Sequence, residues 1–210
     1  MVVSTNKLQA VNTMLAGIGE APIAALPATR ADGQMAESVL DEATREVLSM
    51  GWHFNTEVKT LTRDVNGKVA VPTDYAKIDL YDESLSRLDY EIVVRFDSTG
   101  AGAMRLYNKA HNKNTFVLGI DPKCEIVYYQ DFEQIPETAR RYIMIKAARV
   151  FQDRIAGAPT VHQFQMQDEI MALAALRDQE ATDSDYTIFD GWAAGRVVMR
   201  RNVLNNLNHF

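Results

Sequence analysis

The chain has 210 residues, enough for one large domain or two small ones with a sizeable core. It is 47% hydrophobic and 24% charged, as globular proteins are, and its net charge of −6 disfavours the binding of free nucleic acid as a main task. We find no secretory signal pattern and no apolar run near the roughly 18 residues that a membrane span needs. We therefore expect a protein that is made and kept in a reducing cytoplasm.

The first helical pattern lies close to the N-terminus. We predict that this helix begins near Ser4 or Thr5, because both are good N-cap residues. Its apolar positions recur every three or four residues and form one stripe: Leu8, Val11, Leu15 and Ile18. Gly17 and Gly19 favour its end, and Pro22 prevents it from resuming.

A second helix is predicted over residues 32–50. Its expected buried side consists of Met35, Val39, Ala43, Val47 and Met50. Gly51 suits the C′ position after the helix, where a left-handed backbone costs least. Trp52 and Phe54 are too large to leave in water, and we expect them to anchor the end of this helix in the core.

From residue 56 to about residue 130 the apolar period changes to two, which is typical of strands. Asn66-Gly67 lies between two alternating runs, and it predicts a β-hairpin that joins the strand at Val58 to the strand at Val69. Further strands are predicted at residues 78–80, 92–96, 104–107, 116–118 and 126–129, with turns at residues 97–100 and 111–114. Five to seven short strands favour an antiparallel sheet or a small barrel.

Two more helical patterns follow the strands. Ile135-Pro136-Glu137 predicts the start of a third helix, which we expect to end at Gly157. Its expected apolar face consists of Tyr142, Ile143, Ala147, Val150, Phe151 and Ile155. A fourth helix is predicted over residues 160–181. The side chains expected to face inward from it are Phe164, Ile170, Met171, Leu173, Ala174 and Leu176.

Together these elements predict an α+β fold. The first two helices need the last two to cover their apolar stripes, so we expect a discontinuous four-helix bundle with an inserted antiparallel β-sheet or small barrel domain and an extended C-terminal tail. The predicted domains are a helical domain made of residues 1–55 and 133–183, a β domain of residues 56–132, and a docking tail of residues 184–210.

The segment after Asp183 has no regular pattern but keeps many apolar residues, unlike most disordered tails. We therefore expect it to dock on its own chain or on a neighbour. Trp and Arg are the residue types that most often anchor interfaces. The candidate partner-binding residues in this segment are Phe189, Trp192, Arg196, Arg200 and Arg201.

The third helix carries a run of basic residues, which are Arg140, Arg141, Lys146, Arg149 and Arg154. Two interpretations stay open. The run can pair with acidic groups on another subunit or protein, with Arg140, Arg141 and Arg149 as the candidate partner-binding residues. Alternatively, it is the solvated side of an amphipathic helix. Arg140 and Arg141 are adjacent and cannot share one face closely, so they can serve different partners.

We find little that indicates catalysis. The candidate acid pairs, Asp131 with Glu133 and Asp183 with Asp185, are neighbours at element ends, where acids commonly stabilise helix starts and turns. No nucleophile elbow, zinc-protease motif or phosphate-binding loop occurs. The histidines are scattered without metal-ligand spacing: His53, His111, His162 and His209. Cys124 is the single cysteine and is expected to be a buried, inert thiol. We therefore predict no enzyme, no metal and no cofactor.

Several segments resemble the tail tubular protein A family, the head-to-tail adaptors of short-tailed bacteriophages (podoviruses). Residues 8–23 are similar to the family's opening, with Asn in the helix followed by Ile-Gly-Glu-x-Pro. Gly51-Trp52-His53-Phe54-Asn55 resembles its Gly-Trp-x-Phe-Asn stretch. Phe132-Glu133-Gln134-Ile135-Pro136-Glu137, with the helix positions after it, resembles the start of its third helix. Ala156-Gly157-Ala158-Pro159 matches its last interhelical link.

The resemblance implies a structural virion protein. In this family a homododecameric ring lies beneath the portal protein, with the tail nozzle protein (tail tubular B type) below it. Genomic DNA passes through the lumen without sequence-specific binding. The expected location is the virion tail, assembled in the host bacterial cytoplasm, with no cofactor and no membrane partner.

Two alternatives to the adaptor are a tail-associated glycan (exopolysaccharide) hydrolase and a head-completion adaptor of a long-tailed phage. The second usually has a smaller non-helical part than this chain.

Overall fold

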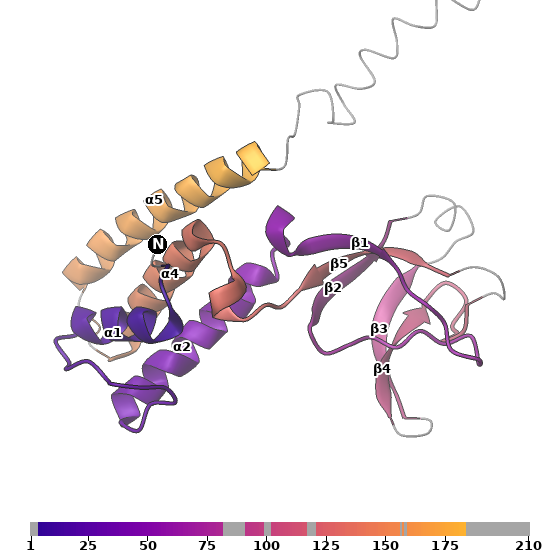
Figure 1. The fold of residues 1–210 in the computed structure, drawn as a ribbon, viewed down its shortest axis with the longest axis horizontal. Helices are drawn as coiled ribbons and strands as arrows, with labels where there is room; N and C mark the ends of the chain where they lie inside the picture. The colour runs from indigo at the N-terminus through magenta and orange to yellow at the C-terminus, as the bar shows by residue number, and fades with distance from the viewer. Residues whose placement is uncertain are drawn as a thin grey trace, which may run out of the picture.

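The computed structural model describes residues 4–81, 91–98, 102–116, 121–155, 157 and 159–183. Within these residues the chain forms four α helices and five strands, so the predicted α+β class is confirmed. The helices gather at one end of the molecule and the strands at the other (Figure 1). None of the helices in the described ranges is long and apolar enough to cross a bilayer.

Helix α1 spans Lys7–Gly17, and its N-cap is Asn6 rather than the predicted Ser4 or Thr5. The Asn6 side chain accepts a hydrogen bond from the Gln9 backbone N–H, and the Gln9 side chain accepts one from the Asn6 N–H. This capping box satisfies two N–H groups that a helix start leaves unpaired. Thr5 does not cap this helix. Its backbone N–H instead donates a hydrogen bond to the Glu137 carboxylate, at 3.0 Å.

Helix α2 spans Ala31–Leu48. Its predicted core positions Val39, Ala43 and Val47 are buried, but Met35 and Met50 are about half exposed, so those two predictions were wrong. The buried side of α2 includes the residue that follows Met35 but not Met35 itself. Met50 lies beyond the end of the helix.

The anchoring of the α2 end by aromatic residues is confirmed. Trp52 is buried, its indole N–H donates to the Val47 carbonyl at 2.8 Å, and Phe54 packs against the same core. Gly51 has the left-handed backbone that the sequence suggested, with φ of 75°, but it lies two residues beyond the C-cap Ser49 rather than at C′.

The strands form two antiparallel sheets. The three-stranded sheet has the order β1-β5-β2, and the second sheet pairs β3 with β4. The strand bounds are Thr56–Thr60 for β1, Tyr75–Leu80 for β2, Ile92–Asp97 for β3, Ala103–Asn108 for β4 and Lys123–Tyr128 for β5. Five of the predicted strands therefore correspond to observed strands. The strand predicted at Val58 is β1, and the others correspond to β2, β3, β4 and β5.

The turn at Asn66-Gly67 forms, but the hairpin predicted around it does not. The Gly67 N–H donates to the Asp64 carbonyl at 2.9 Å, and Gly67 has φ of 76°. Strand β1, however, pairs with β5, and the segment after the turn pairs with β4 through Val69. The turn thus carries the chain from one sheet to the other rather than folding a strand onto its neighbour.

The remaining predictions for this region have mixed outcomes. The turn at residues 111–114 is confirmed, with Asn112 at φ of 52°. Phe116 is buried but lies outside any strand, and its N–H donates to the Gly67 carbonyl at 2.9 Å. The rest of the strand predicted at residues 116–118 and half of the turn predicted at residues 97–100 lie outside the described residues.

Helix α4 spans Glu137–Ile155 and helix α5 spans Pro159–Asp183. Helix α4 lies centrally and packs against α1, α2 and α5. Most of its predicted apolar face is in the core, as Tyr142, Ile143, Ala147 and Phe151 are buried. Ile155, at the last position of the helix, is exposed, which corrects the prediction for that residue.

The molecule has two separate hydrophobic cores. One lies among the four helices and includes Trp52 and Phe132, and the other lies in the strand region around Leu106 and Ile126. Cys124 belongs to the second core, where burial raises the pKa of its thiol to about 12, as expected of an inert cysteine. The boundaries of the predicted domains and the discontinuous bundle stay predictions.

Candidate interaction surfaces

Arg140, the first basic residue of α4, points into the molecule. Only 7% of it is exposed, and its guanidinium donates to the Thr5 carbonyl at 2.8 Å. It also lies 3.4 Å from the carboxylate of Glu137, one turn earlier. Arg140 therefore ties the segment before α1 to the start of α4, and it does not lie on a solvated helix face.

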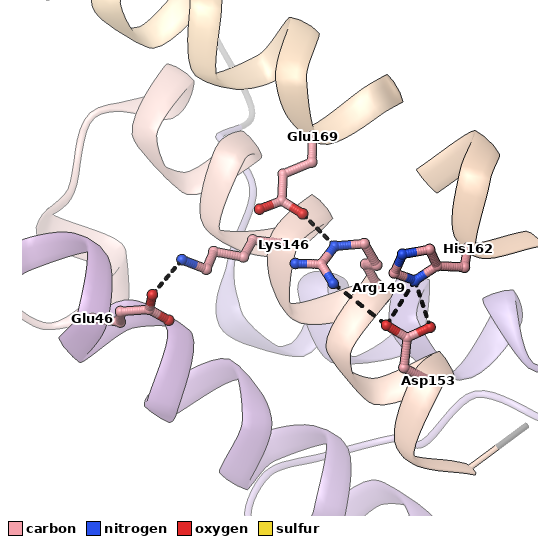
Figure 2. Close-up of polar contacts among 6 residues, drawn as sticks. All are labelled: Glu46, Lys146, Arg149, Asp153, His162 and Glu169. Carbon is pink, nitrogen blue, oxygen red and sulfur yellow. Dashed lines mark hydrogen bonds and ion pairs between the residues drawn. The ribbon is translucent and has the colours of Figure 1, made fainter. Parts of the chain in front are cut away.

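Lys146 and Arg149 join α4 to its neighbours (Figure 2). Lys146 is buried, and its ammonium lies 2.7 Å from the Glu46 carboxylate on α2. Arg149 donates to Glu169 on α5. That hydrogen bond raises the pKa of the Arg149 guanidinium. Partly buried pairs of this kind fix the register of neighbouring helices because breaking them leaves a poorly solvated charge.

The corner between α4 and α5 carries a further polar cluster. Asp153 accepts from Arg149 at 3.4 Å, and both its carboxylate oxygens lie 2.9 Å from Nδ1 of His162 (Figure 2). Near the same corner, Arg154 makes two hydrogen bonds to Glu42 on α2, at 2.8 and 3.0 Å. The basic run of α4 thus serves mainly to hold helices of one chain together.

Arg141 differs from the other basic residues of α4. Its side chain is exposed and makes no hydrogen bond or ion pair within the described part of the chain. It lines a groove of about 410 Å³ between α4 and α5, together with Asp168 and Met171. The predicted contact of Arg140, Arg141 and Arg149 with a partner stays a prediction, and Arg141 is the residue whose charge faces outward.

Helix α5 presents an exposed side that the sequence interpretation placed in the core. We call it the outer α5 face, and its residues, all exposed, are Gln163, Phe164, Met166, Gln167, Ile170, Met171 and Ala174. Phe164 is 71% exposed and Met171 is 73% exposed. The inward orientation predicted for Phe164, Ile170, Met171 and Ala174 was therefore wrong, whereas that of Leu173 and Leu176 is confirmed.

The reason is the peripheral place of α5. It packs on α4 through a narrow stripe that includes Ala172 and Leu176, and it forms the outer edge of the helical region (Figure 1). The acids within the same stretch lie to the sides of the outer face. Glu169 pairs with Arg149 on α4, and Asp168 borders the groove that Arg141 lines. The outer α5 face consequently carries no charged side chain. It is mainly apolar, with the two glutamines as its polar members and with Asp168 and Arg141 at its border beside Met171.

Other candidate residues do not form a site. The five tail residues Phe189, Trp192, Arg196, Arg200 and Arg201 lie outside the described residues, as do Asp185 and His209. Glu133 accepts a hydrogen bond from the Lys7 backbone N–H, as expected of an acid at an element end. His53 is exposed. Across the described ranges, no group of three His, Cys, Asp or Glu side chains could hold a metal ion.

The comparison with protein families identifies the class of protein. The sequence model of a family described as "Tail tubular protein" matches residues 8–186, well over half of the chain. The chain belongs to the tail tubular protein family. This tail tubular protein is therefore a structural component of a bacteriophage tail, and the family resemblance seen in the sequence is confirmed. A search of curated proteins finds no match to it.

Proposed function

We propose that this tail tubular protein is a ring-forming adaptor that joins the head portal to the tail nozzle and forms part of the DNA ejection channel. The observation that supports this best is the outer α5 face. Large, contiguous apolar surfaces without charge are uncommon on proteins that work as monomers, and they usually mark a contact. A structural tail protein that exposes such a face has a natural use for it in assembly.

The internal pairs of α4 support the same proposal. A ring closes only if every subunit presents the same surfaces at the same angle. The contacts from Lys146 to Glu46 and from Arg149 to Glu169 hold α2, α4 and α5 in a fixed arrangement. Such a stiff helical body suits a subunit that repeats around an axis.

The finer parts of the proposal come from the sequence. The ring of twelve, the portal above and the nozzle below follow the resemblance to tail tubular protein A. We propose that residues 184–210 dock on the portal through Phe189, Trp192, Arg196, Arg200 and Arg201, with Arg141 as a further contact. The net charge of −6 suits a conduit for DNA, since a lumen that bound many phosphates would retain the genome.

The direct experiment mixes the purified protein with purified portal and measures the mass of the complex by native mass spectrometry. We expect twelve copies of the 23.6-kDa chain on each portal ring. A variant that lacks residues 186–210 should keep its helical circular dichroism but bind portal weakly. If the full-length chain does not bind the portal, the adaptor proposal is wrong. If the same sample releases sugars from a capsular polysaccharide, the hydrolase function is favoured instead.

A further inference from the structure

The outer α5 face requires a partner surface of a particular kind. It extends over residues 163–174, which is about 16 Å of helix. A charged group pressed against Phe164, Ile170 or Met171 would lose water without gaining a partner, and that loss is costly. The complementary surface must therefore be uncharged over a similar length.

The outward side of α2 does not meet this requirement. Its exposed residues include the charged Glu42, Arg45 and Glu46. Glu42 and Glu46 are already paired with basic residues of α4, so covering them would bury charge. A neighbouring subunit that placed α2 against the outer α5 face would bring these charges onto Phe164 and Met171.

The outward side of α1 does meet it. The exposed residues along this helix are uncharged, namely Gln9, Thr13, Ala16 and Gly17. The charged residue of α1, Lys7, turns toward α2, where its ammonium lies 2.8 Å from Asp41 and 3.4 Å from Glu37. We call this uncharged side the outer α1 face.

The shapes of the two faces are also complementary. The outer α1 face, from Gln9 to Gly17, extends over about 12 Å, so it can cover most of the length of the outer α5 face. The Thr13 hydroxyl donates to the Gln9 carbonyl of its own helix, so its polar group needs no outside partner. A Cβ atom added at Gly17 would meet nothing within 4 Å, so this end of the face is open. Small residues on one helix accept large side chains such as Phe164 from another.

We propose that, in the assembled tail, the outer α5 face of each subunit packs against the outer α1 face of the next subunit. Two different surfaces meet in this contact, so it is heterologous, and a heterologous contact repeats from copy to copy until a ring closes. The inference rests on the proposed ring function and identifies the surfaces that would build it.

The test introduces two thiols into one chain, through Gly17→Cys and Met171→Cys. After assembly on the portal, a short bis-maleimide should join neighbouring subunits into a ladder of multimers. Each single variant should give no cross-link, because only one member of the pair is present. Cys124 does not compete, since it is fully buried and burial raises the pKa of its thiol to about 12.

A matched control combines Met171→Cys with Met35→Cys. Met35 is exposed on α2, so a thiol at this position is accessible to the reagent. Because α2 lies outside the proposed contact, this pair should give no ladder. A ladder from the control pair that equals the ladder from the test pair would overturn the assignment to α1.

The other outcomes separate this inference from the proposed function. Cross-linked dimers from Met171→Cys alone would show that α5 meets α5, which overturns the heterologous contact. A portal-bound ring of the expected mass without a ladder would also overturn the contact but would leave the adaptor proposal intact. If the wild-type chain forms no ring on the portal, the proposed function itself fails. Finally, the thiol introduced by Met171→Cys should react with maleimide in the free subunit, and protection there would mean that the subunit covers this face itself.

Discussion

Helices α4 and α5 follow one another in the chain but place their side chains in opposite ways. Helix α4 lies at the centre of the helical region and turns even basic residues such as Arg140 and Lys146 toward its neighbours. Helix α5 lies at the edge and exposes large apolar residues such as Phe164 and Met171. The number of neighbours around a helix, more than its composition, decides which of its side chains are buried.

The difference assigns separate tasks to the two helices. The charges of α4 hold the subunit together, because their partners lie on α2, on α5 and before α1. The apolar residues of the outer α5 face are exposed and contribute little to the folding of the free subunit, and we propose that a neighbouring subunit buries them. Substitutions in α4 should therefore affect stability, whereas substitutions on the outer α5 face should affect assembly.

A pair of phenylalanine substitutions should show this contrast with the largest effect. Phe151 on α4 is fully buried, and Phe151→Ala should lower the free energy of unfolding by about 3–5 kcal/mol because it leaves a cavity. Phe164→Ala on α5 should change it by no more than about 0.5 kcal/mol. Urea unfolding of the free subunit measures both. Equal losses in the two variants would mean that Phe164 is covered in the free subunit.

An intermediate effect is expected from the charge that links the two helices. Arg149→Met keeps the apolar stem but leaves the mostly buried Glu169 carboxylate without its partner, which should cost about 1–2 kcal/mol of unfolding free energy. Arg154→Met is the matched control on the same helix, because its pair with Glu42 is exposed to solvent and should contribute much less. A control that loses as much stability as Arg149→Met would contradict the role of the α4–α5 pair.

The smallest effect concerns the pH dependence of that exposed pair. The hydrogen bonds from Arg154 lower the pKa of the Glu42 carboxyl below its ordinary value of about 4.3. The folded pKa is depressed, so the stability from this pair is present above the ordinary glutamate pKa and is lost as the pH falls through the folded pKa. Melting temperatures of wild type and Arg154→Met should therefore differ slightly at neutral pH and converge in acid. High salt should remove the difference at every pH.

The sequence predicts best what depends on local patterns. All five strands, β1 to β5, were found from alternation, and the role of Trp52 followed from its size and its place after a helix. The pairing of β1 with β5 was not predicted. The turn signal at Gly67 identifies the residues that reverse the chain, but it does not identify which strands pair. The pairing of strands that are far apart in the sequence depends on how the whole strand region packs, and no local pattern contains that information.

The outer α5 face was missed for a related reason. Helical periodicity locates apolar residues around a helix, but it does not say how many neighbours will cover them. Apolar residues occur on several sides of α5, from Phe164 to Leu173 and Leu176, and a peripheral helix can bury only one of these sides. The pairing of Arg149 with Glu169 was also not predicted, since 20 residues and a helix corner separate them.

Methionine oxidation offers the most direct test of the central claim, which is that assembly buries the outer α5 face. Met166 and Met171 are exposed in the subunit, Met35 is an exposed reference on α2, and Met14 is a buried one. Mild peroxide followed by mass spectrometry would give the oxidation rate of each methionine in the free subunit and in the portal-bound complex. We predict that Met166 and Met171 become protected in the complex while Met35 stays reactive. Unchanged oxidation of Met166 and Met171 in assembled tails would contradict the account.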